Sequence, residues 1–129
     1  MNIEVSYIKQ QLPILKEKFP NAEYITNFKP DYAGIISIPD FNLPKGWNLS
    51  KSDIHFDIPF CYPFCNPINF YVDKDLRLAS GRLPVFINYL TFNNKKYLRF
   101  EYKVDAWNPN HDDLLTYVWV IKSRLYNLK

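Results

Sequence analysis

The sequence predicts an α+β fold in which helices pack against one antiparallel sheet. Helical periodicity occurs near the two ends of the chain, and short β-rich runs separated by turn residues fill the middle. The chain has 129 residues, of which 47% are hydrophobic and 18% aromatic, so it has enough apolar material for a packed core. Neither an internal repeat nor a linker is visible, and we expect a single domain over residues 1–129.

The first element expected is a helix within residues 3–19, where apolar residues such as Ile8 and Leu15 recur near helical spacing. Pro13 conflicts with this pattern because proline lacks a backbone N–H and clashes with the preceding turn. The helix is therefore expected either to kink at Pro13 or to start near it. Pro20 is expected to end it.

Four β-rich runs and a hairpin are expected next. The runs cover residues 22–28, 32–41, 53–60 and 68–73, and the hairpin covers 85–103 with Asn93-Asn94 at its turn. Within the third run, Ile54, Phe56 and Ile58 alternate onto one face. His55 and Asp57 are therefore expected on the opposite face, with His55 exposed to solvent.

The C-terminal segment is strongly periodic. Apolar residues from Leu114 to Leu128 recur in steps of three to four, which predicts a helix. Asn110 or Asp112 is expected to cap it, and the neighbouring acidic side chains suit the positive end of a helix. An acid–base role for His111 beside these aspartates is less favoured, because capping alone explains the cluster.

Composition and spacing argue against several classes of function. The net charge is only +3 and no run of Lys and Arg stands out, so nucleic-acid binding is not indicated. The three glycines are far apart, which leaves no phosphate-binding loop and no expected cofactor. The histidines and cysteines lack a usual zinc spacing, so no metal is expected. No apolar run of about 18 residues predicts a membrane span, and no secretion signal is recognised, so a cytoplasmic location is expected.

Residues 56–67, FDIPFCYPFCNP, contain both cysteines of the chain. A disulfide between Cys61 and Cys65 is not expected, because it would close a very small loop stiffened by proline, and free thiols suit a reducing cytoplasm. Apolar surroundings raise the pKa of a thiol. A cysteine hydrolase, which needs a thiol activated near His55 or His111, is therefore not favoured. Both cysteines are expected to fill an aromatic, proline-rich corner, and they remain weak catalytic candidates.

The order of these elements resembles the ubiquitin-conjugating enzyme (UBC-like) superfamily. The sequence Tyr-Pro-Phe-Cys-Asn-Pro at 62–67 looks like its Tyr-Pro-x-x-Pro-Pro segment, with Asn66 replacing one proline. IHFDIP and INFYVD look like its third and fourth strands, and Trp107 with Pro109 looks like its Trp-x-Pro segment. The likeness is closest to the bacterial proteins called prokaryotic family E. It implies a four-stranded antiparallel sheet plus an extra hairpin, packed against an N-terminal and a C-terminal helix.

This resemblance also implies a function in ubiquitin-like protein modification. In the superfamily, a cysteine receives the carboxyl group of a ubiquitin-like protein from an activating enzyme, and these two proteins are the implied partners. The corresponding residues 73–92 contain neither the usual His-Pro-Asn triplet nor a cysteine, and Pro84 occupies the region where the cysteine would follow. Ser80 remains a weak candidate for an ester-forming nucleophile, with Arg77 and Arg82 to attract a carboxylate.

Contact with partner proteins is implied for the Tyr-Pro loop and the Trp segment. The residues expected to contribute are Phe60, Tyr62, Pro63, Phe64, Pro67 and Trp107. The missing cysteine leaves two roles open, namely a non-canonical catalyst and a non-catalytic adaptor for the activating enzyme or the ubiquitin-like protein. The alternative function is a protein-interaction module unrelated to ubiquitin-like transfer. Its surface would be the aromatics of residues 89–107, although these are more simply core residues.

Overall fold

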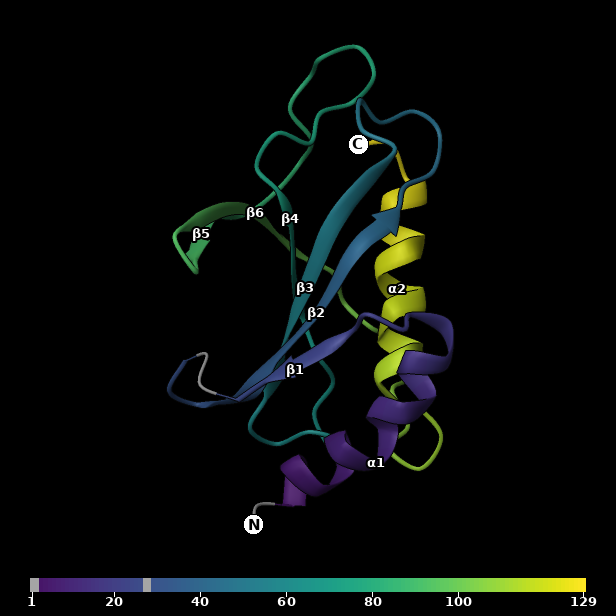
Figure 1. The fold of residues 1–129 in the computed structure, drawn as a ribbon. Coiled ribbons are helices and arrows are strands. Elements are labelled where there is room, and N and C mark those ends of the chain that lie inside the picture. Colours follow the sequence, from purple (N-terminus) through teal and green to yellow (C-terminus); the bar gives the residue numbers. More distant parts are fainter. Residues whose placement is uncertain (1–2, 27–28) are drawn as a thin grey trace.

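The computed structural model describes residues 3–26 and 29–129, which form two helices and one six-stranded sheet (Figure 1). In chain order the elements are α1 (Ile3–Lys18), β1 (Glu23–Ile25), β2 (Tyr32–Asn42), β3 (Lys51–Pro59), β4 (Asn69–Asp73), β5 (Asn88–Phe92), β6 (Lys95–Glu101) and α2 (Leu114–Tyr126). The strands lie in the order β1-β2-β3-β4-β6-β5, and all neighbours are antiparallel. The predicted α+β class is confirmed.

The sheet differs from the predicted four strands with a separate hairpin. Strand β6 pairs with β4 from Asn69↔Glu101 to Asp73↔Tyr97, so the hairpin continues the same sheet. Its turn lies at Asn93-Asn94 as predicted, and both residues take positive φ. The run expected at 22–28 forms a strand only at Glu23–Ile25, and positions 27 and 28 lie outside the described residues.

Helix α1 passes through Pro13 instead of starting there. Pro13 is exposed, whereas Ile8 and Leu15 are fully buried, so the proline ring lies away from the buried face of the helix. Gln11 is three residues from Ile8 and four from Leu15, which places a polar side chain on that same buried face.

Helix α2 is capped by Asp113, so the prediction of Asn110 or Asp112 as the cap was wrong. The Asp113 carboxylate accepts a hydrogen bond from Thr116 N at 2.9 Å, and the Asp113 N–H donates to Thr116 Oγ1 at 3.0 Å. Asp112 instead accepts from Asn108 N, which shapes the turn before the helix. Leu128, expected in the apolar stripe, lies beyond the helix end and is exposed.

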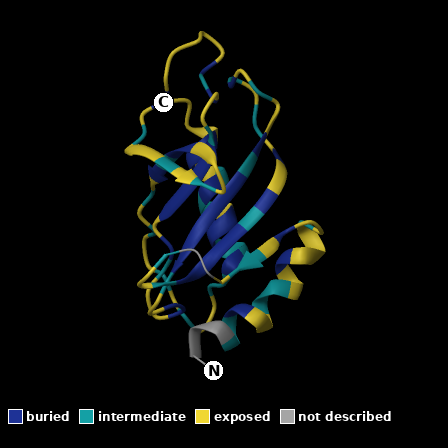
Figure 2. Cartoon of the chain, turned by 60° about the vertical axis from the view of Figure 1, so that its left-hand side comes forward, coloured by how far each residue is buried: buried dark blue, intermediate teal, exposed yellow. Residues whose placement is uncertain are grey.

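The main core lies between the helices and one face of the sheet. Ile54, Phe56 and Ile58 of β3 are fully buried, as their alternation predicts. The Phe56 ring lies 5.1 Å from the ring of Tyr117 on α2. Figure 2 shows the buried residues concentrated on the central strands, and much of the exposed surface on the loops and the outer side of α1.

The opposite face of β3 is also buried, so the prediction of a solvated His55 was wrong. His55 is only 8% exposed and Asp57 only 1%. A second apolar cluster that includes Tyr71 and Tyr97 lies on this face, and Phe92 from the hairpin packs against it. The Tyr97 ring is 4.7 Å from the His55 ring, and Tyr71 donates a 2.5 Å hydrogen bond to Asp57. Burial of this face depends on the hairpin, which pairs with β4 rather than with β3.

The buried His55 should make stability dependent on pH. Burial lowers the pKa of His55 to about 4, from about 6.5 in an unfolded chain. Between these values the unfolded state binds more protons, so His55's contribution to the unfolding free energy falls as pH decreases from 6.5 to 4. We expect a loss on the order of 3 kcal/mol across that window.

Chemical denaturation of the protein and of His55→Gln at several pH values measures this effect, because their difference isolates His55 from the carboxylates. His111→Gln is the matched control, since His111 is the other histidine and is exposed. An equal pH dependence in the native protein and His55→Gln would contradict the assignment.

Candidate functional site

The loop between β3 and β4, residues 60–68, is fixed to the rest of the fold at its centre. Tyr62 is almost fully buried, and its hydroxyl donates to the side-chain oxygen of Gln11. The same Gln11 oxygen accepts a hydrogen bond from the N–H of Leu114, the first residue of α2, at 3.1 Å. One acceptor on α1 thus joins this loop to the start of α2.

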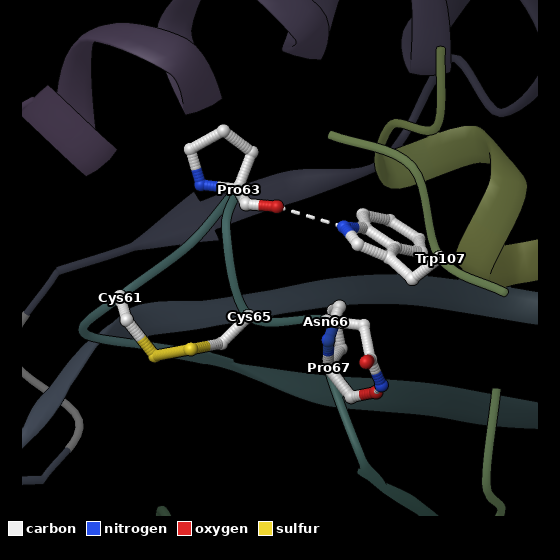
Figure 3. The surroundings of a disulfide bond; sticks show 6 residues. All are labelled: Cys61, Pro63, Cys65, Asn66, Pro67 and Trp107. Atoms are coloured by element: carbon white, nitrogen blue, oxygen red, sulfur yellow. Dashed lines mark hydrogen bonds between the residues drawn. A yellow bond between two sulfur atoms is a disulfide. The ribbon is translucent and has the colours of Figure 1, made fainter. Parts of the chain in front are cut away.

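A second anchor comes from the segment before α2. The indole N–H of Trp107 donates to the carbonyl oxygen of Pro63 at 2.7 Å (Figure 3). Pro63 and Pro67 are buried, and the Tyr62-Pro63 peptide bond is cis. Buried prolines and two side-chain anchors therefore position the loop before any partner binds.

Three large apolar side chains on this loop are exposed. Phe60 is 55% exposed, Phe64 is 68% exposed and Ile68 is 49% exposed. Of the six residues predicted to contact partners, only Phe60 and Phe64 present most of their surface to solvent. The buried Tyr62, Pro63 and Pro67 and the partly buried Trp107 support the loop from below. Partner contact itself remains a prediction.

Cys61 and Cys65 form a disulfide, which corrects the expectation of two free thiols (Figure 3). Their Cα atoms are 5.3 Å apart, within the range that a disulfide spans. A tight turn brings them together, because the N–H of Cys65 donates to the carbonyl of Cys61 at 3.1 Å. Both residues are exposed, but neither carries a free thiol in this state. The thiolate chemistry of a thioester carrier or of a cysteine hydrolase is therefore blocked in this state.

Ser80 lies exposed on a turn that follows β4. The turn is closed by a 2.7 Å hydrogen bond from Gly81 N to Leu78 O, and Gly81 has a φ of +91°. The Ser80 hydroxyl accepts a long 3.4 Å hydrogen bond from Arg82 N. No acid or base among the described residues is hydrogen bonded to it, whereas a nucleophilic serine needs an adjacent base.

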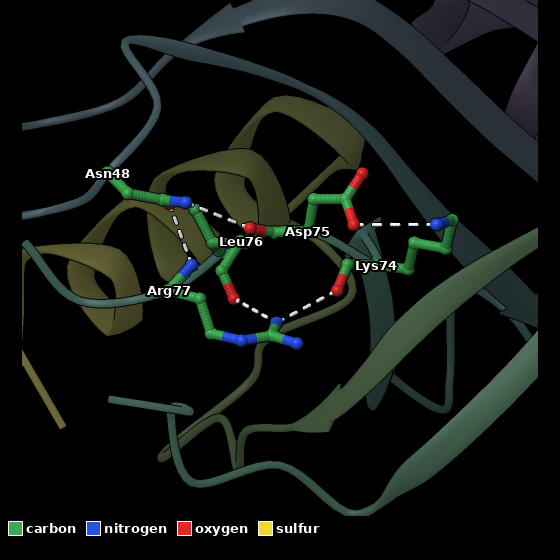
Figure 4. Close-up of polar contacts among 5 residues, drawn as sticks. All are labelled: Asn48, Lys74, Asp75, Leu76 and Arg77. Carbon is green, nitrogen blue, oxygen red and sulfur yellow. Dashed lines mark hydrogen bonds and ion pairs between the residues drawn. The ribbon is translucent and has the colours of Figure 1, made fainter. Parts of the chain in front are cut away.

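The polar side chains around this turn stabilise it through hydrogen bonds to backbone groups. The Arg77 guanidinium donates to the carbonyls of Lys74 and Leu76, as Figure 4 shows. Asn48, which arrives from the loop before β3, donates to Asp75 O at 2.9 Å and accepts from Arg77 N at 2.7 Å. Among residues 73–92 the side-chain amide is that of Asn88, whose oxygen accepts a 2.8 Å hydrogen bond from Arg99 Nε.

Other chemistries receive little support from the described part of the chain. No group of three or more His, Cys, Asp or Glu side chains there is placed to hold a metal ion. Among the same residues, none of the helices has both the length and the apolar character to cross a membrane. Of the hairpin aromatics considered as an alternative surface, Tyr97 is buried and Tyr89 is exposed, so they do not form one exposed row.

The helix–sheet–helix order, the braced Tyr-Pro loop and the Trp107 anchor define a conjugating-enzyme-like (E2-like) protein. The family model for prokaryotic E2 family E matches residues 13–127, and the chain belongs to this family. Neither a curated protein nor a solved structure matches the chain.

Gln11 is the supporting residue that the sequence-based prediction missed. A signal for it was present, because Gln11 shares the helix face of Ile8 and Leu15, where a polar group needs a buried partner. Its partners lie 51 and 103 residues away in sequence, and no local pattern identifies them.

The Cys61–Cys65 disulfide leads to a direct chemical prediction. Protein purified without reductant and then unfolded should show no reactive thiols, and two after reduction. Because the cysteines are four residues apart, reduction should lower the unfolding free energy by only about 2 kcal/mol. The double variant Cys61→Ser/Cys65→Ser should have the unfolding free energy of the reduced protein, and reductant should not change it. Two thiols in the unreduced protein would contradict the bond.

Proposed function

We propose that this protein is a non-catalytic E2-like component of a bacterial ubiquitin-like protein modification pathway, and that it binds a pathway protein through residues 60–68. The observation that carries the proposal is a contrast between two loops. Hydrogen bonds on its buried side hold the Tyr-Pro loop in place, and its aromatic side chains are exposed. The loop after β4, in contrast, has no nucleophile that is hydrogen bonded to a base.

The Tyr-Pro loop has the physical properties of a docking edge. Exposed aromatic rings supply contact area at low entropic cost and dominate the energy of many interfaces, and here Phe60 and Phe64 are available. Their backbone is held by buried prolines, by the bond from Trp107 and by the disulfide, so little order is lost on binding. Ile68 extends the apolar surface at the end of the loop.

The segment after β4 supports a role without covalent transfer. Thioester chemistry needs an exposed thiolate, but this segment has no cysteine and Pro84 is buried in it. Ser80 lacks a hydrogen-bonded base, and the two cysteines of the chain are paired elsewhere. A protein with this geometry holds a partner in place and leaves the transfer step to another component.

The partners that suit this role are the activating enzyme and the ubiquitin-like protein of the same pathway. Such a pathway operates on ATP. A protein-interaction module outside ubiquitin-like transfer is the alternative, and it would bind neither of these partners.

Replacing Phe64 with alanine should weaken binding to the activating enzyme or the ubiquitin-like protein by about tenfold or more, as expected for an exposed aromatic anchor. Isothermal titration with each purified partner measures the change. Tyr126→Ala is the matched control, because Tyr126 is equally exposed, at 62%, but lies at the far end of α2 (Figure 1).

Gln11→Leu tests the support beneath the loop without altering its exposed surface. It removes the acceptor shared by Tyr62 and Leu114, so binding should weaken even if the variant remains folded by circular dichroism. Native affinity in Phe64→Ala, or no binding of either partner by the native protein, would overturn the proposed function.

A further inference from the structure

A row of exposed apolar side chains leads into the last strand of the sheet. Leu83, Val85, Ile87 and Tyr89 are each between 42% and 65% exposed. The intervening Pro84 is buried and Phe86 is half-buried. Alternate side chains of residues 83–87 thus point to solvent, which is the spacing of an extended chain with one exposed face. Its backbone is already bonded, because Val85 N–H donates to Lys129 O at 3.2 Å and Ile87 N–H donates to Arg99 O at 2.8 Å.

Strand β5, residues Asn88–Phe92, forms one edge of the sheet, and its partner is β6. The turn has two residues, so Phe92↔Lys95 and Leu90↔Tyr97 are the hydrogen-bonded pairs of the ladder. Tyr89 and Thr91 alternate with them, and their backbone N–H and C=O groups therefore point away from β6. By this register, neither N–H belongs to a hydrogen-bonded pair of the ladder with β6.

Strand β5 lacks the charges and prolines that usually prevent a further strand from adding. Natural edge strands carry charges or proline, or are very short. The sequence of β5, NYLTF, has neither a charge nor a proline, and it is five residues long. The opposite edge, β1, is only three residues long.

A small hollow beside the row offers a place for one apolar side chain. It has a volume of about 190 Å³, and Val85 and Ile87 contribute to its lining. At its base the buried Arg124 guanidinium donates to the Val85 carbonyl at 3.0 Å, which fixes the segment before β5. Helix α2 therefore holds the row in position, so little conformational entropy is lost when a partner binds it.

Charge at this edge favours an acidic partner. The ammonium group of Lys96 lies 4.3 Å from the centre of the Tyr89 ring, beside the free edge. Arg82 and Lys129 are exposed on the neighbouring segments, whereas Glu101 is already paired with Arg99 at 3.6 Å. A second copy of the chain would bring like charges together, so self-pairing is disfavoured.

We propose that β5 forms a β-addition edge that binds an extended, acidic segment of a partner protein, with residues 83–87 as an apolar surface beside it. The segment adds a seventh strand through the backbone groups of Tyr89 and Thr91, and its alternate apolar side chains pack on Val85 and Ile87. Acidic side chains of the segment lie near Lys96. The residues that carry this proposal lie outside the loop at 60–68, so it does not depend on the function proposed for that loop.

The test uses a synthetic peptide of alternating valine and glutamate, about eight residues long, added to isotopically labelled protein. NMR should show shifts centred on Tyr89 and Thr91, and the exchange of these two amide hydrogens should slow by about tenfold or more on saturation. A peptide with lysine in place of glutamate should bind at least about tenfold more weakly. A glutamate peptide N-methylated at the pairing positions should not bind.

Thr91→Pro removes an outward N–H without removing a ladder hydrogen bond, since proline is tolerated on that side of an edge strand. It should abolish binding, whereas Thr91→Val should retain it. If Thr91→Pro does not fold, Lys96→Glu provides a second variant. It should bind the glutamate peptide more weakly and the lysine peptide more tightly than the native protein does.

No shift at Tyr89 and Thr91 with the glutamate peptide at about 1 mM would overturn the proposal. Equal binding of the two charged peptides would also overturn it. So would protection of both amides without peptide together with a dimer in analytical ultracentrifugation, because a second copy would then occupy the edge.

Discussion

The arrangement of the molecule depends on a single acceptor, the side-chain oxygen of Gln11. It accepts a hydrogen bond from the Tyr62 hydroxyl of the Tyr-Pro loop and another from the N–H of Leu114 at the start of α2. Burial raises the pKa of the Tyr62 hydroxyl, which keeps it a donor. Without this acceptor, two buried donors would lose their partner, and each unsatisfied group costs about 1–3 kcal/mol. The first helix, the Tyr-Pro loop and the last helix are therefore positioned together.

Patterns confined to a few residues predicted much of this fold. Helical spacing located α2, alternation located β3, and Asn93-Asn94 located the hairpin turn, because each signal is local. The pairing of β6 with β4 joins residues far apart in the sequence, so no local pattern predicts it. This pairing produces the six-stranded sheet and contributes to the burial of His55. The residues of the Tyr-Pro loop were identified by resemblance. Their division into exposed rings and buried supports, and the disulfide beside them, depends on three-dimensional packing.

Polar side chains stabilise the two loops that bear on function in different ways. In the loop after β4, Asn48 and Arg77 hydrogen bond to backbone groups, and these polar side chains are used to hold the turn. In the Tyr-Pro loop, the polar anchors lie beneath the surface and the apolar rings lie above it. The polar side chains after β4 are therefore occupied in holding the backbone, while the proposed contact surface is exposed and preformed. This division supports a protein that positions a partner without forming a bond to it.

The most direct test of this account is the intact mass of the protein after incubation with the activating enzyme and the ubiquitin-like protein of its own system, with ATP. Half of each sample is treated with thiol reductant before measurement. A positioning role predicts no adduct in either half, and the reduced half gains only the two hydrogens of the opened Cys61–Cys65 disulfide, while binding of a partner is detected in parallel. An adduct removed by reductant would reveal a thioester, and Cys61→Ser and Cys65→Ser would identify the thiol. An adduct that resists reductant but yields to hydroxylamine would point to an ester on Ser80. Either adduct would contradict a purely positioning role.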